Sequence, residues 1–374
     1  MKKLLVLTAL LAVSLPYNLL AQGCDNPYDI MTQGLESFNQ AYYQDALEQF
    51  QKIHPNDTSY AVALYEQAYC LYQMERYDEA IELFSEGLEM TSDVRVNFFN
   101  SLANAYDEGG QQEKAIDYYN QGLVEFPYNG DLYHNKGIVL EKQEKWEEAF
   151  EAYKKGLIVA PYHAGCHYRL GRLAAHQGLR TQSMLAYTMS VLVDPVSDNA
   201  ITRLVEMENM LAGNFEKKEF EIDLSNNGGE SYPEIDMALE NNFANNSAYK
   251  YPHKKVDYAF ARHLHLALTE LKDNKSLDGF WADTYLPLYN KVLADGNFNY
   301  LINTMVIQVE DPKIQAYLNK KSNRLKTIAF IEKMKVDWDE LNGEKIFPMK
   351  AGEQKTKLVY SDARLVYGAG DFDG

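Results

Sequence analysis

The sequence predicts an all-α protein in which pairs of helices repeat along the chain and a further, mostly helical region follows. Three observations support this. A helix-like segment recurs every 34 or 35 residues, small and aromatic residues keep fixed places within it, and glycines or prolines separate the copies. With 374 residues, 46% of them hydrophobic, the chain is long enough to bury a substantial core.

Each copy is organised around one small residue, and these residues lie 34, 35, 34 and 34 positions apart. They are Ala46, Ala80, Ala115, Ala149 and Ser183. A ring stands four positions later, at Phe50, Phe84, Tyr119, Tyr153 and Tyr187. A second small residue stands twelve positions earlier, at Gly34, Ala68, Ala103, Gly137 and Gly171. The first residue and the ring share one helix face, while the second small residue belongs to a preceding helix, so two closely packed helices are expected per copy.

Turn residues separate these expected helices. Gly109, Gly110 and Gly178 fall between the first and second helix of a pair, where glycine takes a positive φ at little cost. Three prolines, Pro127, Pro161 and Pro195, follow second helices and should end them.

The 34-residue period, the small–small–aromatic spacing and the late proline resemble the tetratricopeptide repeat (TPR) over about residues 27–197. The resemblance implies stacked helical hairpins in a right-handed superhelix with a concave groove. It also implies a protein that binds other proteins. A single hairpin of this kind leaves its apolar face uncovered, so stacking explains the repetition.

The expected organisation has five parts. Residues 1–22 are a signal peptide, 27–212 hold five TPR repeats and a capping helix, and 213–233 form a linker. Residues 234–345 are a helical C-terminal region, and 346–374 are a tail with a possible short β-hairpin. In the capping segment, Ile201 and Val205 are spaced as on one face of another first helix.

The C-terminal region should contain helices near 232–241, 256–271, 279–294, 298–309 and 313–338, with Asp311-Pro312 starting the last. These helices lack the 34-residue period. Two interpretations remain open, a diverged continuation of the array and a separate helical domain.

The first 22 residues have the layout of a bacterial secretory signal peptide: Lys2 and Lys3, an apolar run over 4–15, and a short exit. Cys24 in "LLAQGC" resembles a lipobox cysteine, which would carry lipid. Ala21 and Gln22 stand where a lipobox normally has leucine and a small residue, so cleavage near Ala21 is favoured over lipidation. The expected location is outside the cytoplasm, periplasmic or associated with the outer membrane.

The composition argues against several classes of partner and of structure. A formal net charge of −18 disfavours nucleic acid and anionic lipid. No run of about 18 apolar residues follows the leader, so no transmembrane segment is expected. Three widely spaced cysteines do not form a disulfide framework.

Neither a catalytic residue nor a metal or cofactor site is expected. The sequence holds no Gly-rich phosphate loop, G-x-S-x-G elbow or HExxH motif. His163 and His167 are four apart, but His163 falls in the loop after Pro161. His263 and His265 would point about 200° apart on a helix. Packing and surface histidines are the favoured interpretation.

The candidate binding residues lie on first helices, beside the stripe expected to be buried. They are Tyr65, Tyr69, Tyr72, Asn97, Asn100, Asn104, His134, Glu141, Tyr168 and Arg172. Rings can cover the side chains of an extended peptide while amides pair with its backbone. The carboxylate clamp of chaperone-binding TPRs needs several basic residues, and only Arg172 is evident here.

Two other interpretations compete with this groove. The protein's own C-terminal half could fill it. Alternatively, the seven basic residues between Lys313 and Lys335 could form a docking patch, although a solvated helix face is the commoner case.

The function expected is that of an exported, non-enzymatic protein–protein adaptor or scaffold in the bacterial cell envelope, with a protein or peptide partner. The alternatives are a structural component of an export or surface assembly, and an enzyme regulated by the repeats.

Overall fold

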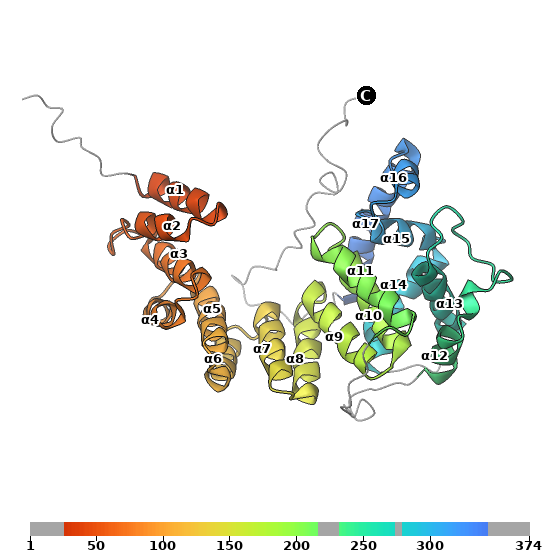
Figure 1. Cartoon of the computed structure of the whole chain (residues 1–374), viewed down its shortest axis with the longest axis horizontal. Coiled ribbons are helices and arrows are strands. Elements are labelled where there is room, and N and C mark those ends of the chain that lie inside the picture. Colours follow the sequence, from red (N-terminus) through yellow and green to blue (C-terminus); the bar gives the residue numbers. More distant parts are fainter. Residues whose placement is uncertain (1–25, 216–231, 274–278, 343–374) are drawn as a thin grey trace, which may run out of the picture. The chain divides into compact units, whose positions relative to one another are not determined.

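The computed structural model describes residues 26–215, 232–273 and 279–342 (Figure 1). In this part of the chain the regular elements are helices, and no strand occurs, which confirms the all-α prediction. The signal peptide 1–22, Cys24, most of the linker 213–233 and the tail 346–374 lie outside the described residues. No described helix is both long enough and apolar enough to cross a bilayer.

The chain divides into two compact units, residues 1–109 and 110–374. Unit 1 contains α1 (Pro27–Asn39), α2 (Tyr43–Phe50), α3 (Tyr60–Gln73), α4 (Tyr77–Leu88) and α5 (Arg95–Glu108). Helices α1 and α2 form one hairpin, α3 and α4 form the next, and α5 packs on α4.

Unit 2 contains the later repeat helices and the C-terminal helices. The array comprises α6 (Gln112–Glu125), α7 (Gly130–Lys142), α8 (Trp146–Val159), α9 (Ala164–His176), α10 (Arg180–Leu192) and α11 (Asn199–Leu211). The remaining helices are α12 (Pro233–Glu240), α13 (Ala259–Asp273), α14 (Phe280–Ala294), α15 (Phe298–Met305), α16 (Pro312–Leu318) and α17 (Lys321–Asn342). The division into 27–212, 213–233 and 234–345 stays a prediction.

The repeated residues lie where the spacing places them. The five small residues from Ala46 to Ser183 and the five rings from Phe50 to Tyr187 are all fully buried. A Cβ atom added to Gly34 would lie 2.4 Å from Phe50 Cε1, and one added to Gly137 would lie 2.4 Å from Tyr153 Cε1. The ring therefore occupies the space that a side chain on the first helix would need, which explains the small residue.

The hairpin turns share one backbone conformation. Ala41, Glu75, Gly110, Glu144 and Gly178 lie in the turns that follow α1, α3, α5, α7 and α9, and they have φ between 60° and 79°. Only two of the five are glycines, so three turns adopt the left-handed conformation with a side chain present. The glycine pattern therefore indicated only two of the five turns, and Gly109 has an ordinary negative φ of −76°.

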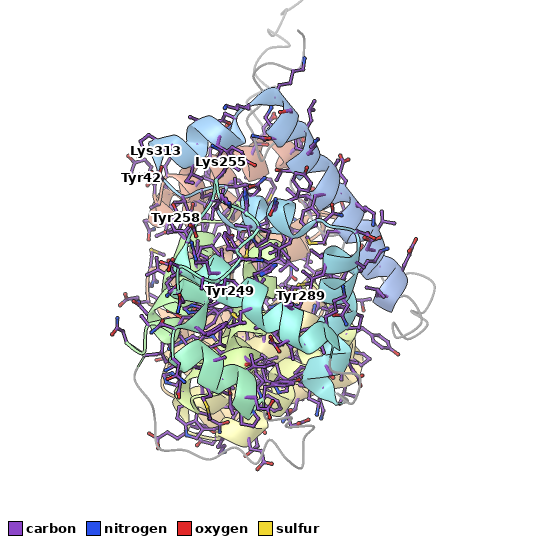
Figure 2. All side chains as sticks on the ribbon, turned by 90° about the vertical axis from the view of Figure 1, so that its right-hand side faces the viewer. Tyr42, Tyr249, Lys255, Tyr258, Tyr289 and Lys313 are labelled. Atoms are coloured by element: carbon purple, nitrogen blue, oxygen red, sulfur yellow. The ribbon has the colours of Figure 1, made fainter. Side chains whose placement is uncertain are left out.

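The C-terminal helices cover α10, whose residues 181–192 are all buried. Helices α12, α14 and α15 all contact α10. The hydroxyl of Tyr289 on α14, a residue labelled in Figure 2, donates to the Leu185 carbonyl at 2.8 Å. Asp236 Oδ1, on α12, accepts from Thr181 N at 2.8 Å and from Thr181 Oγ1 at 2.6 Å. The two bonds to Asp236 satisfy polar groups at the start of α10 that would otherwise be buried without partners.

One helix prediction in the C-terminal region is corrected and another is confirmed. The single helix expected over 313–338 is two helices, because the backbone turns at Asn319 and Lys320, where Asn323 Nδ2 donates to the Tyr317 carbonyl at 2.8 Å. The helix start at Asp311-Pro312 is confirmed, since Asp311 Oδ1 accepts from Lys313 N and Ile314 N at 2.8 and 3.1 Å.

Helix α11 buries a different face from the one marked by Ile201 and Val205. Its buried apolar residues are Ala200, Leu204, Met207, Met210 and Leu211. Ile201 is half-buried and Val205 is 48% exposed, because they lie on the flank of the buried face.

Candidate partner-binding surfaces

In unit 1, Tyr65, Tyr69 and Tyr72 form a stacked row on α3, here called the tyrosine row. The ring centroids of Tyr65 and Tyr69 lie 5.9 Å apart, and those of Tyr69 and Tyr72 lie 5.8 Å apart, with the ring planes within 10° of parallel. Phe38 of α1 stacks on Tyr69 at 5.5 Å. Helical spacing of three and four residues aligns these rings, and all three tyrosines are half-buried. The row is therefore held rigid before any partner binds.

The ends of the tyrosine row are fixed by polar and edge contacts. The Tyr65 hydroxyl lies 3.0 Å from Ser101 Oγ on α5, and Tyr77 meets Tyr72 edge-on at 5.6 Å. Burial raises the pKa of Tyr65, and burial and then Glu108 raise the pKa of Tyr72 to about 12. Both hydroxyls stay neutral at physiological pH, so they can donate hydrogen bonds.

The three asparagines of α5 are placed unequally. Asn97 is exposed, whereas Asn100 and Asn104 are half-buried and already take part in other interactions. Of the predicted amide ladder, Asn97 is thus the most accessible to a new partner.

In unit 2, the carboxylates of Glu141 and Glu206 bind side chains of the fourth and fifth repeats. Glu141 accepts from the Tyr153 hydroxyl at 2.5 Å and from Arg169 Nη1 at 3.4 Å. Glu206 of α11 accepts from the Tyr168 hydroxyl at 2.9 Å and from the Tyr187 hydroxyl at 3.0 Å.

Both arginines of α9, Arg169 and Arg172, pack against the ring of Tyr168. Arg172 Nε lies 3.8 Å from Glu206 Oε2. The guanidinium carbons of Arg169 and Arg172 lie 5.9 and 5.7 Å from the centroid of the Tyr168 ring. Stacking of this kind orients the arginines as well as attracting them. The surface is therefore a balanced network of paired charges and contains no concentrated positive charge, in contrast with a carboxylate clamp.

His134 lies against other rings and is neutral. Its centroid lies 4.7 Å from that of His163 and 6.0 Å from that of Tyr153. Burial and then the neighbouring His163 lower the pKa of His134 to about 3. It therefore contributes a ring and a polar edge to this surface rather than a charge.

Sequence reasoning missed Arg169 and Glu206. Arg169 directly follows Tyr168, and on a helix it borders the same stripe. Glu206 lies on α11, whose register was assigned from Ile201 and Val205. Its bonds to Tyr168 and Tyr187 depend on how α11 packs against the fifth repeat, which no local sequence signal indicates.

The C-terminal helices contact a different set of side chains in the array. Phe150 of α8 packs against Phe280 and Trp281 of α14, with centroids 6.0 and 6.2 Å apart. The Tyr162 hydroxyl reaches the Lys335 carbonyl, on α17, at 3.1 Å. These contacts do not involve His134, Glu141, Tyr168 or Arg172.

A buried bond joins α9 to α14 at His167. His167 Nε2 lies 2.8 Å from the Pro161 carbonyl, which only accepts, so this nitrogen carries the proton. Nδ1 then accepts from the Tyr285 hydroxyl at 2.9 Å. His163 instead uses Nδ1 to cap α9 at Cys166 N and Nε2 to meet Asp131 Oδ1, each at 3.0 Å.

His163 and His167 form hydrogen bonds to different partners and do not converge on one point. Across the described residues no three His, Cys, Asp or Glu side chains converge as a metal site would require. The expectation of no metal and no cofactor stays a prediction.

The basic stretch between Lys313 and Lys335 is partly engaged within the protein. Lys333 Nζ lies 2.8 Å from Asp295 Oδ2 and 2.6 Å from Asp337 Oδ2. Lys313, labelled in Figure 2, Lys320 and Lys326 are exposed. The stretch is spread over two helices, α16 and α17, instead of one continuous face.

Comparison with known proteins relates the repeats to one family. Models described as tetratricopeptide repeat match residues 40–93 and residues 96–123. The photosystem I assembly protein Ycf3 of Synechococcus sp. (strain CC9605) is 32% identical over 101 residues, which are 27% of this chain and 47% of that protein. Ycf3 of Synechococcus sp. (strain CC9902) is 31% identical over 101 residues, which are again 27% of this chain and 47% of that protein. The chain thus spans about half the length of these relatives.

Among solved structures, the chain is similar to MamA 41-end from Desulfovibrio magneticus RS-1, with 15% identity and a TM-score of 0.37 over 46% of this chain and 98% of that one. A MamA RS-1 ArsTM double mutant gives 15% identity and a TM-score of 0.38 over 47% and 98%. The matched repeats, together with the small residues and rings buried at a 34-residue period, show that the chain contains tetratricopeptide repeats.

Proposed function

We propose that this chain is an exported, non-enzymatic adaptor or scaffold of the bacterial cell envelope, and that the tyrosine row on α3 is the main contact for its protein or peptide partner. The observation that carries the proposal is the row itself. Three parallel rings are half-exposed, stacked and fixed at one end by Ser101. Ordered rings lose little conformational entropy on binding, and tyrosine is enriched among the residues that dominate interfaces.

Two further points support this proposal. The Ycf3 relatives are named as photosystem I assembly proteins. The proposed adaptor role takes over only the assembly part of that name, and photosystem I is not proposed as the partner of this chain. The order of charged, apolar and small residues in 1–22 supports export.

Replacing Tyr69 and Tyr72 together by alanine should weaken partner capture strongly. An interface ring of this kind contributes roughly 2 kcal/mol or more, so the loss should exceed about tenfold in affinity. Both rings are half-exposed, so helical content should be retained. The measurement is affinity capture from envelope fractions with mass spectrometry, followed by titration of the identified partner and circular dichroism.

The matched control removes two tyrosines of the same unit that lie outside the row. Tyr28 is 75% exposed and Tyr42 is 59% exposed, and their replacement by alanine should leave capture intact. Replacement of Lys320 and Lys321 by alanine tests the basic stretch. If the lysine variant loses the partner while the folded Tyr69/Tyr72 variant keeps wild-type affinity, the tyrosine row is not the binding surface.

For export, we expect the mature chain to begin at or just after Ala21 and to be found outside the cytoplasm. The leader places two lysines before an apolar run too short to span a bilayer. N-terminal sequencing of protein from fractionated native cells measures this. A retained Met1 in a cytosolic fraction would contradict export, and a diacylated Cys24 would replace the soluble form by an anchored one.

A further inference from the structure

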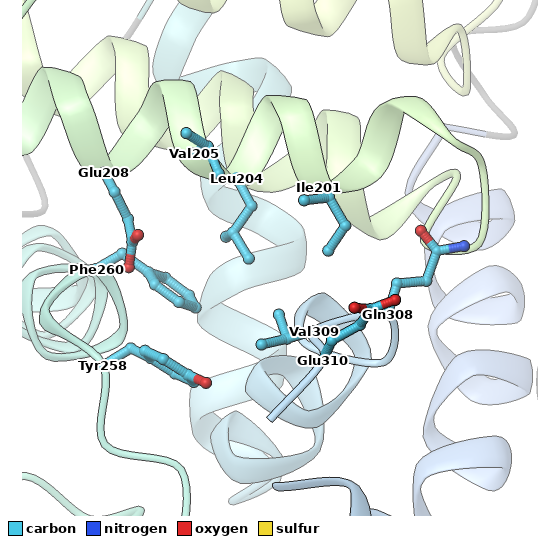
Figure 3. Close-up of a pocket in the computed structure, with 9 residues that line it drawn as sticks. All are labelled: Ile201, Leu204, Val205, Glu208, Tyr258, Phe260, Gln308, Val309 and Glu310. Carbon is cyan, nitrogen blue, oxygen red and sulfur yellow. The ribbon is translucent and has the colours of Figure 1, made fainter. Parts of the chain in front are cut away.

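A pocket of about 360 Å³ lies within unit 2, away from the tyrosine row. It is enclosed by α11, by the start of α13 and by the segment between α15 and α16 (Figure 3). Its floor is apolar and consists of Ile201, Leu204, Val205, Phe260 and Val309. The side chains of Leu204, Phe260 and Val309 point toward one another across it. The volume falls at the lower end of the range for ligand pockets, about 300–1,000 Å³.

Hydrogen bonds fix the segment between α15 and α16 that forms one wall of the pocket. Gln308 Nε2 donates to the Val196 carbonyl, which ties the segment after α15 to the loop before α11. Gln315 Nε2 donates to the carbonyls of Ile307 and Val309 at 2.8 and 2.9 Å. The pocket is therefore preformed, and closing it on a ligand needs little rearrangement.

Two apolar residues of the pocket are unusually accessible. Val205 is 48% exposed and Ile201 is half-buried, although both lie on a helix that has a separate, fully buried face. Their exposure leaves one side of the pocket open to solvent. An open apolar floor of this kind accepts an apolar group from outside.

The rim is negatively charged. Glu208 on α11 and Glu310 after α15 stand at opposite ends of the pocket, and neither forms an ion pair with a described residue. Burial raises the pKa of Glu208, and the pKa of Tyr258 is raised by burial and then by Asp311 and Glu208. The field inside the rim is thus negative, and a cation brought there gains attraction that these carboxylates do not obtain within the protein.

We propose that this pocket is a docking site for a partner peptide in which one apolar side chain enters the pocket between two flanking lysine or arginine residues. The apolar side chain covers Leu204, Phe260 and Val309. The flanking cations pair with Glu208 on one side and Glu310 on the other. Because the carboxylates stand at opposite ends, a peptide with two cations engages both, whereas a small amine engages one.

The test follows methyl resonances of Ile201, Leu204, Val205 and Val309 in the full mature chain during titration with acetyl-Gly-Lys-Leu-Arg-Gly-amide. Saturable shifts at these methyls are expected, and binding should weaken as salt is raised. Acetyl-Gly-Glu-Leu-Glu-Gly-amide and isoamylamine should bind about tenfold more weakly or worse. Comparable affinity for either would overturn the assignment of a basic peptide, as would the absence of saturable shifts at millimolar peptide.

Variants that remove charge test whether the peptide affinity depends on the two carboxylates of the pocket. Glu208→Gln with Glu310→Gln should weaken the basic peptide about tenfold. Glu332→Gln with Glu340→Gln removes the same charge from exposed positions of α17 and should leave the affinity unchanged. Equal weakening by both pairs would show attraction to the acidic chain as a whole and would contradict the site. A retained affinity in Tyr69→Ala with Tyr72→Ala is expected, because the two surfaces share no residue.

Discussion

Ala149→Glu is expected to destabilise unit 2 by about 3–5 kcal/mol, the cost of burying an unpaired carboxylate or of forcing two helices apart. Ala149 on α8 is fully buried in a hydrophobic cluster with Leu140, Phe150 and Tyr153. Gly137, on the facing helix α7, already lies against the Tyr153 ring, so this packing has no spare volume. The melting temperature should fall by more than about 6 °C.

Glu147→Ala is the matched control on the same helix. Glu147 is exposed in the first turn of α8, where a carboxylate interacts weakly with the helix dipole. Its loss should change the free energy of unfolding by about 0.5 kcal/mol. Thermal unfolding followed by circular dichroism compares the two variants, and equal shifts would mean that the phase of the repeat is assigned wrongly.

The repeated part of the fold could be predicted because its constraint is local and recurs. A ring such as Phe50 or Tyr153 needs a small residue on the facing helix, and both appear at fixed spacing. The turns were harder, since Glu75 and Glu144 adopt the left-handed conformation without glycine. The face of α11 was assigned wrongly because its outer flank, with Ile201 and Val205, is also apolar.

The candidate surfaces were predictable only in part. Tyr65, Tyr69 and Tyr72 follow from helical spacing alone, so the sequence placed them on one stripe. The bonds of Glu206 to Tyr168 and Tyr187 depend on how α11 packs at the end of the array. The pocket depends on three segments that are distant in the chain, α11, Tyr258–Phe260 and Gln308–Glu310, and no local pattern brings these together.

The attachment of the C-terminal helices depends strongly on Trp281. Its side chain is 1% exposed, and its ring lies 5.4 Å from Phe280, 5.8 Å from Tyr285 and 6.2 Å from Phe150 of α8. Tyr285 in turn donates to His167. Trp281→Ala should therefore cost about 3–5 kcal/mol, because it leaves a large cavity between α14 and the repeats.

Trp281→Phe separates packing from hydrogen bonding at the same position. The indole Nε1 is buried and has no hydrogen-bond partner among the described residues, so phenylalanine removes an unsatisfied donor as well as apolar area. The two effects oppose each other, and a change within about 1.5 kcal/mol is expected. Urea denaturation ranks the variants, and hydrogen exchange of residues 181–192 reports whether α10 stays covered. Faster exchange in α10 is expected for Trp281→Ala alone. If exchange there is unchanged while α14 loosens, α10 is protected by the other helices and Trp281 does not hold the C-terminal region on the array.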